Sequence, residues 1–359
     1  MTVSGEPAEN KPKVLVVGSG GVGTICALSL TVRDRSEVTL VVRSDYDQVT
    51  SKGFTINSCT YGKIEGWRPH HIAKSVTEAR EKYGEFDYIL VTTKNIPDGQ
   101  YTCEEIIKPA VSEKSTIILV QNGLSIEEPM IKEFPNNIIL SGITLIGSTN
   151  YNGVIENKGP DNVFIGDFKP EAERNPNSAK VIEKFIHIYQ NDNGLNKIQV
   201  DTDVQKTRWE KLVYNCVFNT ITALVDLDVS RAQTFIGNDT LFRPAMKEVI
   251  AIAKSAGVEV TPTIPEKFIH IGDGLFYSPS MCVDMRKKQP MELEVILGNP
   301  LKIAAKNGVP TPILSTVYQL LTLVQYRIKE ANGLFTIDKS LYKGDSDKAN
   351  EIFREHYKH

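Results

Sequence analysis

A glycine-rich turn near the N-terminus constrains the fold of this 359-residue chain more than any other feature. The run GSGGVG fits the spacing G-x-G-x-x-G, follows the β-branched run KVLVV and leads into the helix-like TICALSL. In a strand–turn–helix unit, such glycines permit a tight turn and bring backbone N–H groups at a helix N-terminus close to a pyrophosphate. The motif therefore predicts dinucleotide binding through six residues: Gly18, Ser19, Gly20, Gly21, Val22 and Gly23.

The order of the predicted elements divides the chain into two domains. Strand-like and helix-like segments alternate up to about residue 203, which is the pattern of a parallel α/β sheet of the Rossmann type. Beyond that point strand signals fade, and helix-periodic segments follow at 205–224, 241–256, 291–306 and 313–329. We predict a disordered leader at 1–12, a Rossmann-type dinucleotide-binding domain at 13–203, and an α-helical substrate and catalytic domain at 204–359.

Two local expectations complete this outline. Residues 153–168 contain Gly-Pro and Asp-Asn pairs between short apolar runs, and we expect them to form a β-hairpin. The C-terminal tail ends in a segment that favours an amphipathic helix covering part of the second domain.

Composition excludes several classes of function. Hydrophobic residues make up 41% and charged residues 24%, and the net charge of -3 gives no basic surface for nucleic acid. No apolar run approaches the roughly 18 residues of a membrane span, and the polar leader is unlike a signal peptide. The five cysteines are scattered and lack a CxxC pair, which indicates neither a disulfide scaffold nor a zinc site. We expect a cytoplasmic protein without a metal, nucleic-acid or membrane partner.

The end of the second predicted strand, at Glu37–Arg43, bears on the choice of cofactor. NAD sites usually place Asp or Glu there, to bond the ribose 2′-hydroxyl. Here the strand ends in Arg43, whose guanidinium suits a 2′-phosphate through a bidentate, charge-assisted contact. Asp45 and Asp47 follow closely and leave NAD as the alternative. We predict NADPH/NADP as the cofactor.

Two more predicted strands end in polar residues. Lys94 closes the run YILVTTK, and Gln121-Asn122-Gly123 closes IILVQNG. Each could be ordinary turn chemistry. Because ligands of open α/β sheets bind outside the carboxyl ends of the strands, we predict that Lys94 and Asn122 line the cofactor crevice.

The segment WEKLVYNCVFNTITAL, residues 209–224, carries three polar side chains on an otherwise apolar helix. Lys211, Asn215 and Asn219 are spaced by four residues and so fall on one side of a helix. A partly desolvated lysine has a lowered pKa and can donate a proton near neutral pH. Asparagine amides can hydrogen-bond a substrate without adding charge. The stripe therefore predicts the wall of a binding site.

Taken in order, these features resemble the ketopantoate (2-dehydropantoate) reductase family. The resemblance runs from Val14 to about Pro310. It rests on GSGGVG, on Lys94, on Gln121-Asn122-Gly123, on W-x-K-L-x-x-N-x-x-x-N at 209–219, and on Ser280-Met281 followed by Asp284 and Glu292. It implies a Rossmann domain followed by an all-α domain resembling the C-terminal domain of 6-phosphogluconate dehydrogenase.

The resemblance also implies roles for individual residues. Lys211 matches the general acid that protonates the keto oxygen as hydride arrives at the keto carbon. Asn122 matches the asparagine that touches this lysine and the cofactor, and Glu292 matches a glutamate that helps to hold the lysine and the substrate oxygen. Three residues match substrate contacts: Asn215, Asn219 and Ser280, the last of which binds the substrate carboxylate. Taken alone, Ser280 would be a helix N-cap.

The implied activity is the NADPH-dependent reduction of ketopantoate, a small keto substrate, to pantoate for pantothenate biosynthesis. Three positions depart from the family pattern: Pro97 replaces a glutamine, Val229 an asparagine, and Tyr277 an asparagine or histidine. These departures leave open the reduction of another 2-oxo acid, lactone or ketone on the same scaffold, because losing hydrogen-bonding groups changes discrimination strongly.

Two alternatives belong to other classes. A dinucleotide sensor that does no chemistry would not need Lys211, Asn122, Ser280 and Glu292 together. An oxidative decarboxylase of the β-hydroxyacid type usually has a glycine-rich lead-in to its lysine, whereas the lead-in here is DVQKTRWEK. The sequence leaves a homodimer open.

Overall fold

The computed structural model describes residues 11–340, 342 and 344–357, so most of the predicted leader lies outside the described residues. The chain divides into two compact units. The first unit runs up to Asn95 and adds Cys103–Leu212 and Gly257–Thr261; the second comprises Ile96–Thr102, Val213–Ala256 and the chain from Pro262 onward. The predicted boundary at 203/204 precedes the crossing at 212/213, and a short segment of the N-terminal half belongs to the second unit. The functional assignment of the two domains stays a prediction.

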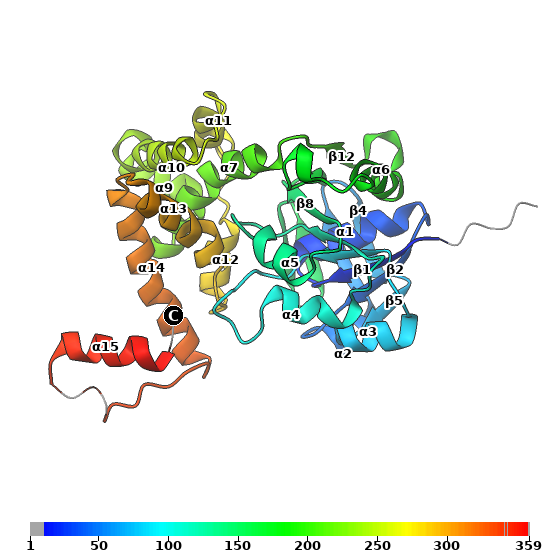
Figure 1. Cartoon of the computed structure of the whole chain (residues 1–359), viewed down its shortest axis with the longest axis horizontal. Helices are drawn as coiled ribbons and strands as arrows, with labels where there is room; N and C mark the ends of the chain where they lie inside the picture. The colour runs from blue at the N-terminus through cyan, green and yellow to red at the C-terminus, as the bar shows by residue number, and fades with distance from the viewer. Residues whose placement is uncertain (1–10, 341, 343, 358–359) are drawn as a thin grey trace, which may run out of the picture. The chain divides into compact units, whose positions relative to one another are not determined.

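The first unit is built on an eight-stranded sheet of order β12-β11-β8-β7-β6-β1-β2-β5 (Figure 1). The strands are β1 Lys13–Val17, β2 Glu37–Val41, β5 His71–Ala73, β6 Tyr88–Val91, β7 Thr116–Leu119, β8 Ile139–Thr144, β11 Asn162–Asp167 and β12 Lys197–Val200. Neighbouring strands are parallel except for β8 and β11. Strands such as YILV and TIIL are buried along their whole length, as a sheet covered on both faces requires.

Helices cover both faces of this sheet. Helices α1 (Gly21–Val32) and α6 (Ser178–Tyr189) contact each other and the sheet on one side. Helices α3 (Val76–Tyr83), α4 (Cys103–Ile107) and α5 (Glu127–Glu133) cover the other side (Figure 1). The carboxyl ends of β1, β6, β7 and β8 therefore meet at one edge, and the glycine-rich turn joins β1 to α1 at that edge. The predicted Rossmann-type fold is confirmed.

A second, smaller sheet of order β4-β3-β10-β9 packs against α1. Its strands are β3 Phe54–Ser58, β4 Gly62–Trp67, β9 Ser148–Tyr151 and β10 Val154–Asn157. The expected hairpin at 153–168 is wrong, because β10 pairs with β3 and β9 while β11 pairs with β8 and β12. The backbone N–H groups of Lys158 and Gly159 both donate to Gly147 O, and this turn carries the chain from one sheet to the other.

The second unit is helical throughout the residues that the structure describes. Its α-helices are α8 Thr220–Val225, α9 Val229–Ile236, α10 Arg243–Ser255, α11 Ile264–His270, α12 Ser280–Arg286, α13 Asn299–Asn307, α14 Pro312–Ala331 and α15 Ser346–Tyr357. Three π-helical turns interrupt them: η4 Asn215–Asn219, η5 Asn238–Phe242 and η6 Glu294–Gly298. All four predicted helical segments are present. The predicted C-terminal helix is α15, whose Phe353 ring lies 5.1 Å from the Tyr326 ring of α14.

No single helix among the described residues has both the length and the apolar composition of a membrane span. One pair of helical stretches, Val204–Val225 and Val229–Ile236, meets those limits only when joined across an 87° bend.

Candidate active site

The glycine-rich turn leaves room for a ligand at one position only. A Cβ on Gly23 would lie 2.0 Å from Gly18 O, and a Cβ on Gly21 would lie 2.3 Å from the Ser148 backbone. Gly18 has a positive φ of 114°. The chain itself thus requires these glycines. A Cβ on Gly20, the N-cap of α1, would meet nothing within 4 Å. The residues present fit a pyrophosphate, because Gly20 leaves open space beside the unpaired N–H groups of a helix N-terminus.

The other two residues of the turn, Ser19 and Val22, contact neighbouring parts of the first unit. Ser19 O accepts hydrogen bonds from Thr24 Oγ1 (3.3 Å) and from Asn150 Nδ2 (2.7 Å). Val22 packs against the apolar core of the first unit. Asn150 Nδ2 also donates to the Asp45 carboxylate at 2.8 Å. Asn150, which the sequence did not single out, therefore ties the glycine-rich turn to the loop after β2.

That loop carries Arg43, two residues past the end of β2. Arg43 is exposed, and its guanidinium forms no hydrogen bond or ion pair with any part of the chain that the structure describes. Asp45, by contrast, is half-buried and bound by Asn150. The Arg43 guanidinium is thus available to a ligand phosphate, whereas the nearby Asp45 carboxylate already accepts a hydrogen bond from Asn150.

The loops after β6 and β7 are joined by Gln121. Its Nε2 donates to Thr93 O at 2.7 Å and to the buried Cys103 Sγ at 3.1 Å. The half-buried Lys94 follows Thr93, and Asn122 follows Gln121. Gln121 therefore fixes, relative to each other, the two loops that the sequence assigned to the cofactor crevice.

Lys211 lies at the carboxyl edge of the sheet. Helix α7 (Val204–Tyr214) presents it there, half-buried. Its Nζ donates to Asn122 Oδ1 at 2.7 Å and to Thr144 O at 2.6 Å. Asn122 follows β7 and Thr144 ends β8. The structure thus brings together Lys211, the expected general acid, and Asn122, the asparagine expected to touch it, on the edge that also holds the glycine-rich turn.

The remaining predicted residues belong to the second unit. Asn219 Nδ2 donates to Ser280 Oγ at 3.4 Å. Asn215 is only 6% exposed, and its side-chain amide makes no hydrogen bond to the described residues. Glu292 is 8% exposed and lies just before η6. Asn215 and Asn219 bound the π-helical turn η4, so the expected α-helical stripe passes through a wider turn, a feature often found at functional sites.

The alternative that Ser280 is a helix N-cap is wrong. Pro279 is the N-cap of α12, and no side chain caps this helix end. Ser280 is the first helical residue and is exposed, because the proline before it already holds the extended conformation of the cap position.

Two of the three departures from the family pattern contact each other. The backbone N–H of Val229, a buried residue that begins α9, donates to Tyr277 O at 3.1 Å. The Tyr277 and Tyr214 hydroxyls are hydrogen-bonded, and burial raises the pKa of both phenols, so both are protonated at neutral pH. Pro97 is exposed. Where the family pattern has an asparagine and an asparagine or histidine, this chain has the aliphatic Val229 and the aromatic Tyr277.

A buried ion pair near Lys211, between Arg208 and Glu127, was not predicted from the sequence. Arg208 Nε lies 2.6 Å from Glu127 Oε1, and the two side chains are 3% and 0% exposed. In the sequence, Arg208 stands within TRWEK and Glu127 within IEEP, where both resemble solvated helix charges. The available signal was spacing, since Arg208 precedes Lys211 by three residues and shares its helix face.

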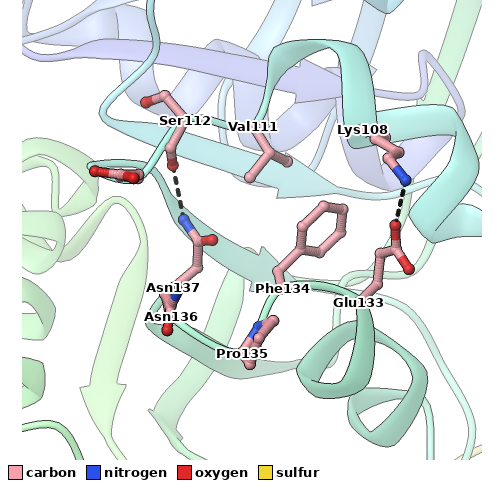
Figure 2. A pocket seen from close by; sticks show the side chains of 9 residues that line it. Lys108, Val111, Ser112, Glu133, Phe134, Pro135, Asn136 and Asn137 are labelled. Carbon is pink, nitrogen blue, oxygen red and sulfur yellow. Dashed lines mark hydrogen bonds and ion pairs between the residues drawn. The ribbon is translucent and has the colours of Figure 1, made fainter.

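One hollow in the first unit lies away from these residues (Figure 2). It measures about 420 Å³ and is walled by Phe134 and by the pairs Lys108–Glu133 (2.6 Å) and Asn137–Ser112 (2.8 Å). These residues lie on the loops that lead into β7 and β8, at the amino ends of the strands. None of the predicted site residues lines this hollow.

Comparisons with known proteins identify the family. The model described as Ketopantoate reductase PanE/ApbA matches residues 14–170, and the model described as Ketopantoate reductase PanE/ApbA C terminal matches residues 203–325. A Saccharomyces cerevisiae protein of uncharacterized function is 45% identical over 350 residues, covering 91% of this chain and 97% of its own. The 2-dehydropantoate 2-reductase of Nostoc sp. is 25% identical over 339 residues, covering 92% of this chain and 99% of its own.

A solved structure agrees with these matches. The crystal structure of 2-dehydropantoate 2-reductase from Methylococcus capsulatus has a TM-score of 0.72 and 28% identity, covering 88% of this chain and 97% of that chain. The predicted family resemblance is therefore confirmed, and so is the predicted class of enzyme, an oxidoreductase acting on C=O and CH–OH groups. The N-terminal and C-terminal parts of the chain each match a model of the ketopantoate reductase family, and the chain belongs to that family.

Proposed function

We propose that this protein is an NADPH-dependent reductase that converts the keto group of a small 2-oxo acid, most specifically ketopantoate, to a hydroxyl group. The observation that carries the proposal is the position of Lys211. Its ammonium is held by Asn122 Oδ1 and Thr144 O at the edge of the sheet where ligands of this fold bind. With ketopantoate as substrate the product is pantoate, a precursor for pantothenate biosynthesis.

The cofactor would be held by the glycine-rich turn and the loops beside it. The N–H groups of the α1 N-terminus, beside the open position at Gly20, would take the pyrophosphate. Arg43, exposed and without a partner among the described side chains, would pair with a 2′-phosphate. Lys94 and Asn122 would complete the contacts. When bound, the nicotinamide supplies the hydride.

Lys211 is proposed as the proton donor. A positioned general acid contributes about 10²–10⁴-fold to a rate, provided that its proton points at the developing charge. The bonds to Asn122 Oδ1 and Thr144 O restrict the orientation of the Lys211 ammonium, which is the restriction that such a role requires. Glu292 is proposed as the second catalytic side chain, in keeping with the family resemblance.

Asn215, Asn219 and Ser280 are proposed as substrate contacts. The Asn215 side chain is only 6% exposed and its amide makes no hydrogen bond to the described residues, so this amide is available to bond a polar ligand. Asn219 and Ser280 are already bonded to each other and offer a hydroxyl at the exposed start of α12. A serine hydroxyl at a helix N-terminus suits a substrate carboxylate.

A second candidate is a reductase on the same scaffold with a different keto substrate. The contact between Val229 and Tyr277 favours it, because two hydrogen-bonding positions of the family pattern, an asparagine at one and an asparagine or histidine at the other, are replaced together. A site without those hydrogen-bonding side chains would discriminate less well between substrates with and without a hydroxyl group.

The function is tested by following NADPH oxidation with ketopantoate, ketopantoyl lactone and other α-dicarbonyl compounds. We expect turnover with NADPH and slower turnover with NADH, and the specificity constants rank the candidate substrates. Lys211→Ala should lower kcat by about 10²–10⁴-fold with NADPH affinity retained. Absence of turnover over the whole panel would contradict the proposal.

Arg43→Ala tests the choice of cofactor. Loss of a charge-assisted contact to a 2′-phosphate, worth about 1.5–3 kcal/mol, should weaken NADPH about 10- to 100-fold and leave NADH nearly unchanged. Arg327→Ala, at an exposed arginine of α14, removes the same charge and should leave both affinities unchanged. Equal losses for the two cofactors in Arg43→Ala would remove Arg43 as the phosphate contact.

A further inference from the structure

The buried ion pair beside Lys211 has no part in the proposed chemistry. Arg208 and Glu127 are almost fully buried, and Ser141 completes the group by donating to Glu127 Oε1 at 2.7 Å and accepting from Arg208 Nε at 2.8 Å. Ser141 is fully buried as well. Desolvation offsets much of the attraction within such a pair, so stability alone is a weak reason to retain it.

The rest of the guanidinium holds the backbone on either side of Asn122. Arg208 Nη1 donates to Gln121 O at 3.0 Å and to Gly123 O at 3.2 Å, and Nη2 donates to Leu119 O at 3.5 Å. A guanidinium presents its donors in one rigid plane, so these contacts fix the direction of the loop as well as its distance. The Asn122 backbone is therefore clamped between two bonded carbonyls.

One face of α7 carries both Arg208, which holds the loop around Asn122, and Lys211, the proposed acid. Arg208 and Lys211 are three residues apart on α7 and lie on one face. Arg208 holds the backbone that flanks Asn122, while Lys211 Nζ contacts Asn122 Oδ1. The network also reaches the second acceptor of Lys211, because Ser141 stands on β8, the strand that ends in Thr144.

We propose that Arg208, with Glu127 and Ser141, is a positioning residue for the proton donor. It fixes α7 against the ends of β7 and β8, so that Lys211 Nζ meets Asn122 Oδ1 and Thr144 O together. Arg208 acts through Lys211 and does not touch the substrate. The inference rests on the proposed function, since it assigns the network its purpose through Lys211. A displacement of about 1 Å at a reacting group can cost about 10²-fold in rate, which is the scale of effect expected here.

The main test replaces both charges at once, with Arg208→Met and Glu127→Gln in one protein. Removing both avoids leaving one buried charge without its partner, and the glutamine keeps an acceptor for Ser141. We expect the melting temperature to stay within a few degrees and the Kd for NADPH within about twofold. We expect kcat to fall about 10- to 100-fold with little change in KM, and the limb of the pH–kcat profile set by the proton donor to shift.

Arg174→Met is the matched control. Arg174 also donates to two backbone carbonyls of the first unit, Lys169 O at 2.9 Å and Thr202 O at 3.2 Å, neither of which flanks Asn122. This variant should keep the wild-type kcat and pH profile. Arg208→Lys keeps the charge but loses the planar fork, so it should not restore kcat.

A second readout does not depend on turnover. An amine-specific acylating reagent modifies unprotonated lysine, and mass spectrometry of the peptide gives the rate at Lys211. With its two acceptors displaced, Lys211 should label several-fold faster in the double variant than in the wild type or in Arg174→Met.

The outcomes separate the two proposals. An unchanged kcat, pH profile and labelling rate in the double variant would overturn the positioning role. If that variant does not fold, Arg208→Lys takes its place and is judged by the same measurements. If the wild type turns over none of the keto compounds, the proposed function fails, and the labelling rates alone still support or refute the positioning role.

Discussion

Gly20 and Gly23 lie three residues apart, yet a methyl group at each would meet different surroundings. At Gly20 nothing stands within 4 Å and φ is -65°, which any residue adopts; at Gly23 the added Cβ would lie 2.0 Å from Gly18 O. Gly20→Ala should therefore keep the wild-type melting temperature but weaken NADPH at least about tenfold, because the methyl group occupies the space proposed for the pyrophosphate. Gly23→Ala should destabilise the fold itself.

Thermal unfolding and NADPH titration of both variants check this contrast. Each serves as the control for the other, since both add one methyl group to the same turn. An unchanged NADPH affinity in Gly20→Ala would mean that no ligand approaches the backbone at this residue.

Single residues also show how far sequence reasoning reaches. Lys211 and Asn122 could be named because each interrupts an apolar run with a polar group, a pattern visible along the chain. Arg208 and Glu127 could not, because a buried charge looks in sequence like an exposed one until its partner is known. That partner lies 81 residues away in the chain, and no local pattern specifies such a contact.

At the scale of elements, segments were predicted better than their pairing. The runs that form β10 and β11 were both expected to be strands, yet each pairs in a different sheet. Alternation and turn residues specify that a strand forms, whereas its neighbours depend on the burial of side chains brought together by the whole unit. The helical segments of the second unit were easier, because helix hydrogen bonds are local.

Asp161 links α1 and α6 to the turn before β4 and sets a pH dependence. It lies between β10 and β11, is fully buried, and accepts hydrogen bonds from Ser29 on α1, Tyr61 before β4 and Tyr189 on α6. Burial raises the pKa of its carboxyl group, although these hydrogen bonds oppose the shift. The folded state therefore keeps a proton that the unfolded chain releases. This contribution to stability is complete below the unfolded pKa of about 3.9 and is lost as the pH rises through the higher folded pKa.

Asp161→Asn removes that contribution. The melting temperature of the wild type should exceed that of Asp161→Asn most at acidic pH, and the gap should narrow as the pH rises. Melting curves of both proteins between pH 4 and pH 8 check the prediction. Asp47→Asn, at a carboxyl group that is 95% exposed, is the control and should follow the wild type at every pH. A gap that widens with rising pH would contradict the assignment.

On the scale of the whole molecule, one short segment of the chain belongs to a different unit from the segments on either side of it. The segment Ile96–Thr102 follows β6 of the first unit but belongs to the second, where Asp98 pairs with Lys329 of α14. The Lys329 side chain is 5% exposed and that of Asp98 32%. Asp98→Ala should destabilise the protein by about 2–4 kcal/mol, somewhat below the cost for a fully buried pair, because water reaches the carboxylate.

Chemical denaturation of a double-mutant cycle checks this value. Adding Lys329→Met to Asp98→Ala removes the unpaired buried charge and should recover most of the loss. Glu133→Ala breaks the exposed pair with Lys108 and, as the control, should cost no more than about 1 kcal/mol. A cost for Asp98→Ala as small as that of the control would show that the pair does not hold the segment.

The pairing of Asp98 with Lys329 also bears on how the protein folds during its synthesis. The two residues are 231 positions apart, and ribosomes add about 5–20 residues per second, so Asp98 emerges about 10–50 s before its partner exists. During that interval the nascent first unit can assemble its sheet, but the stretch between β6 and α4 cannot yet form its ion pair with Lys329. Release of the last helices from the exit tunnel, rather than completion of the nucleotide-binding half, then sets the moment at which that stretch reaches its final place.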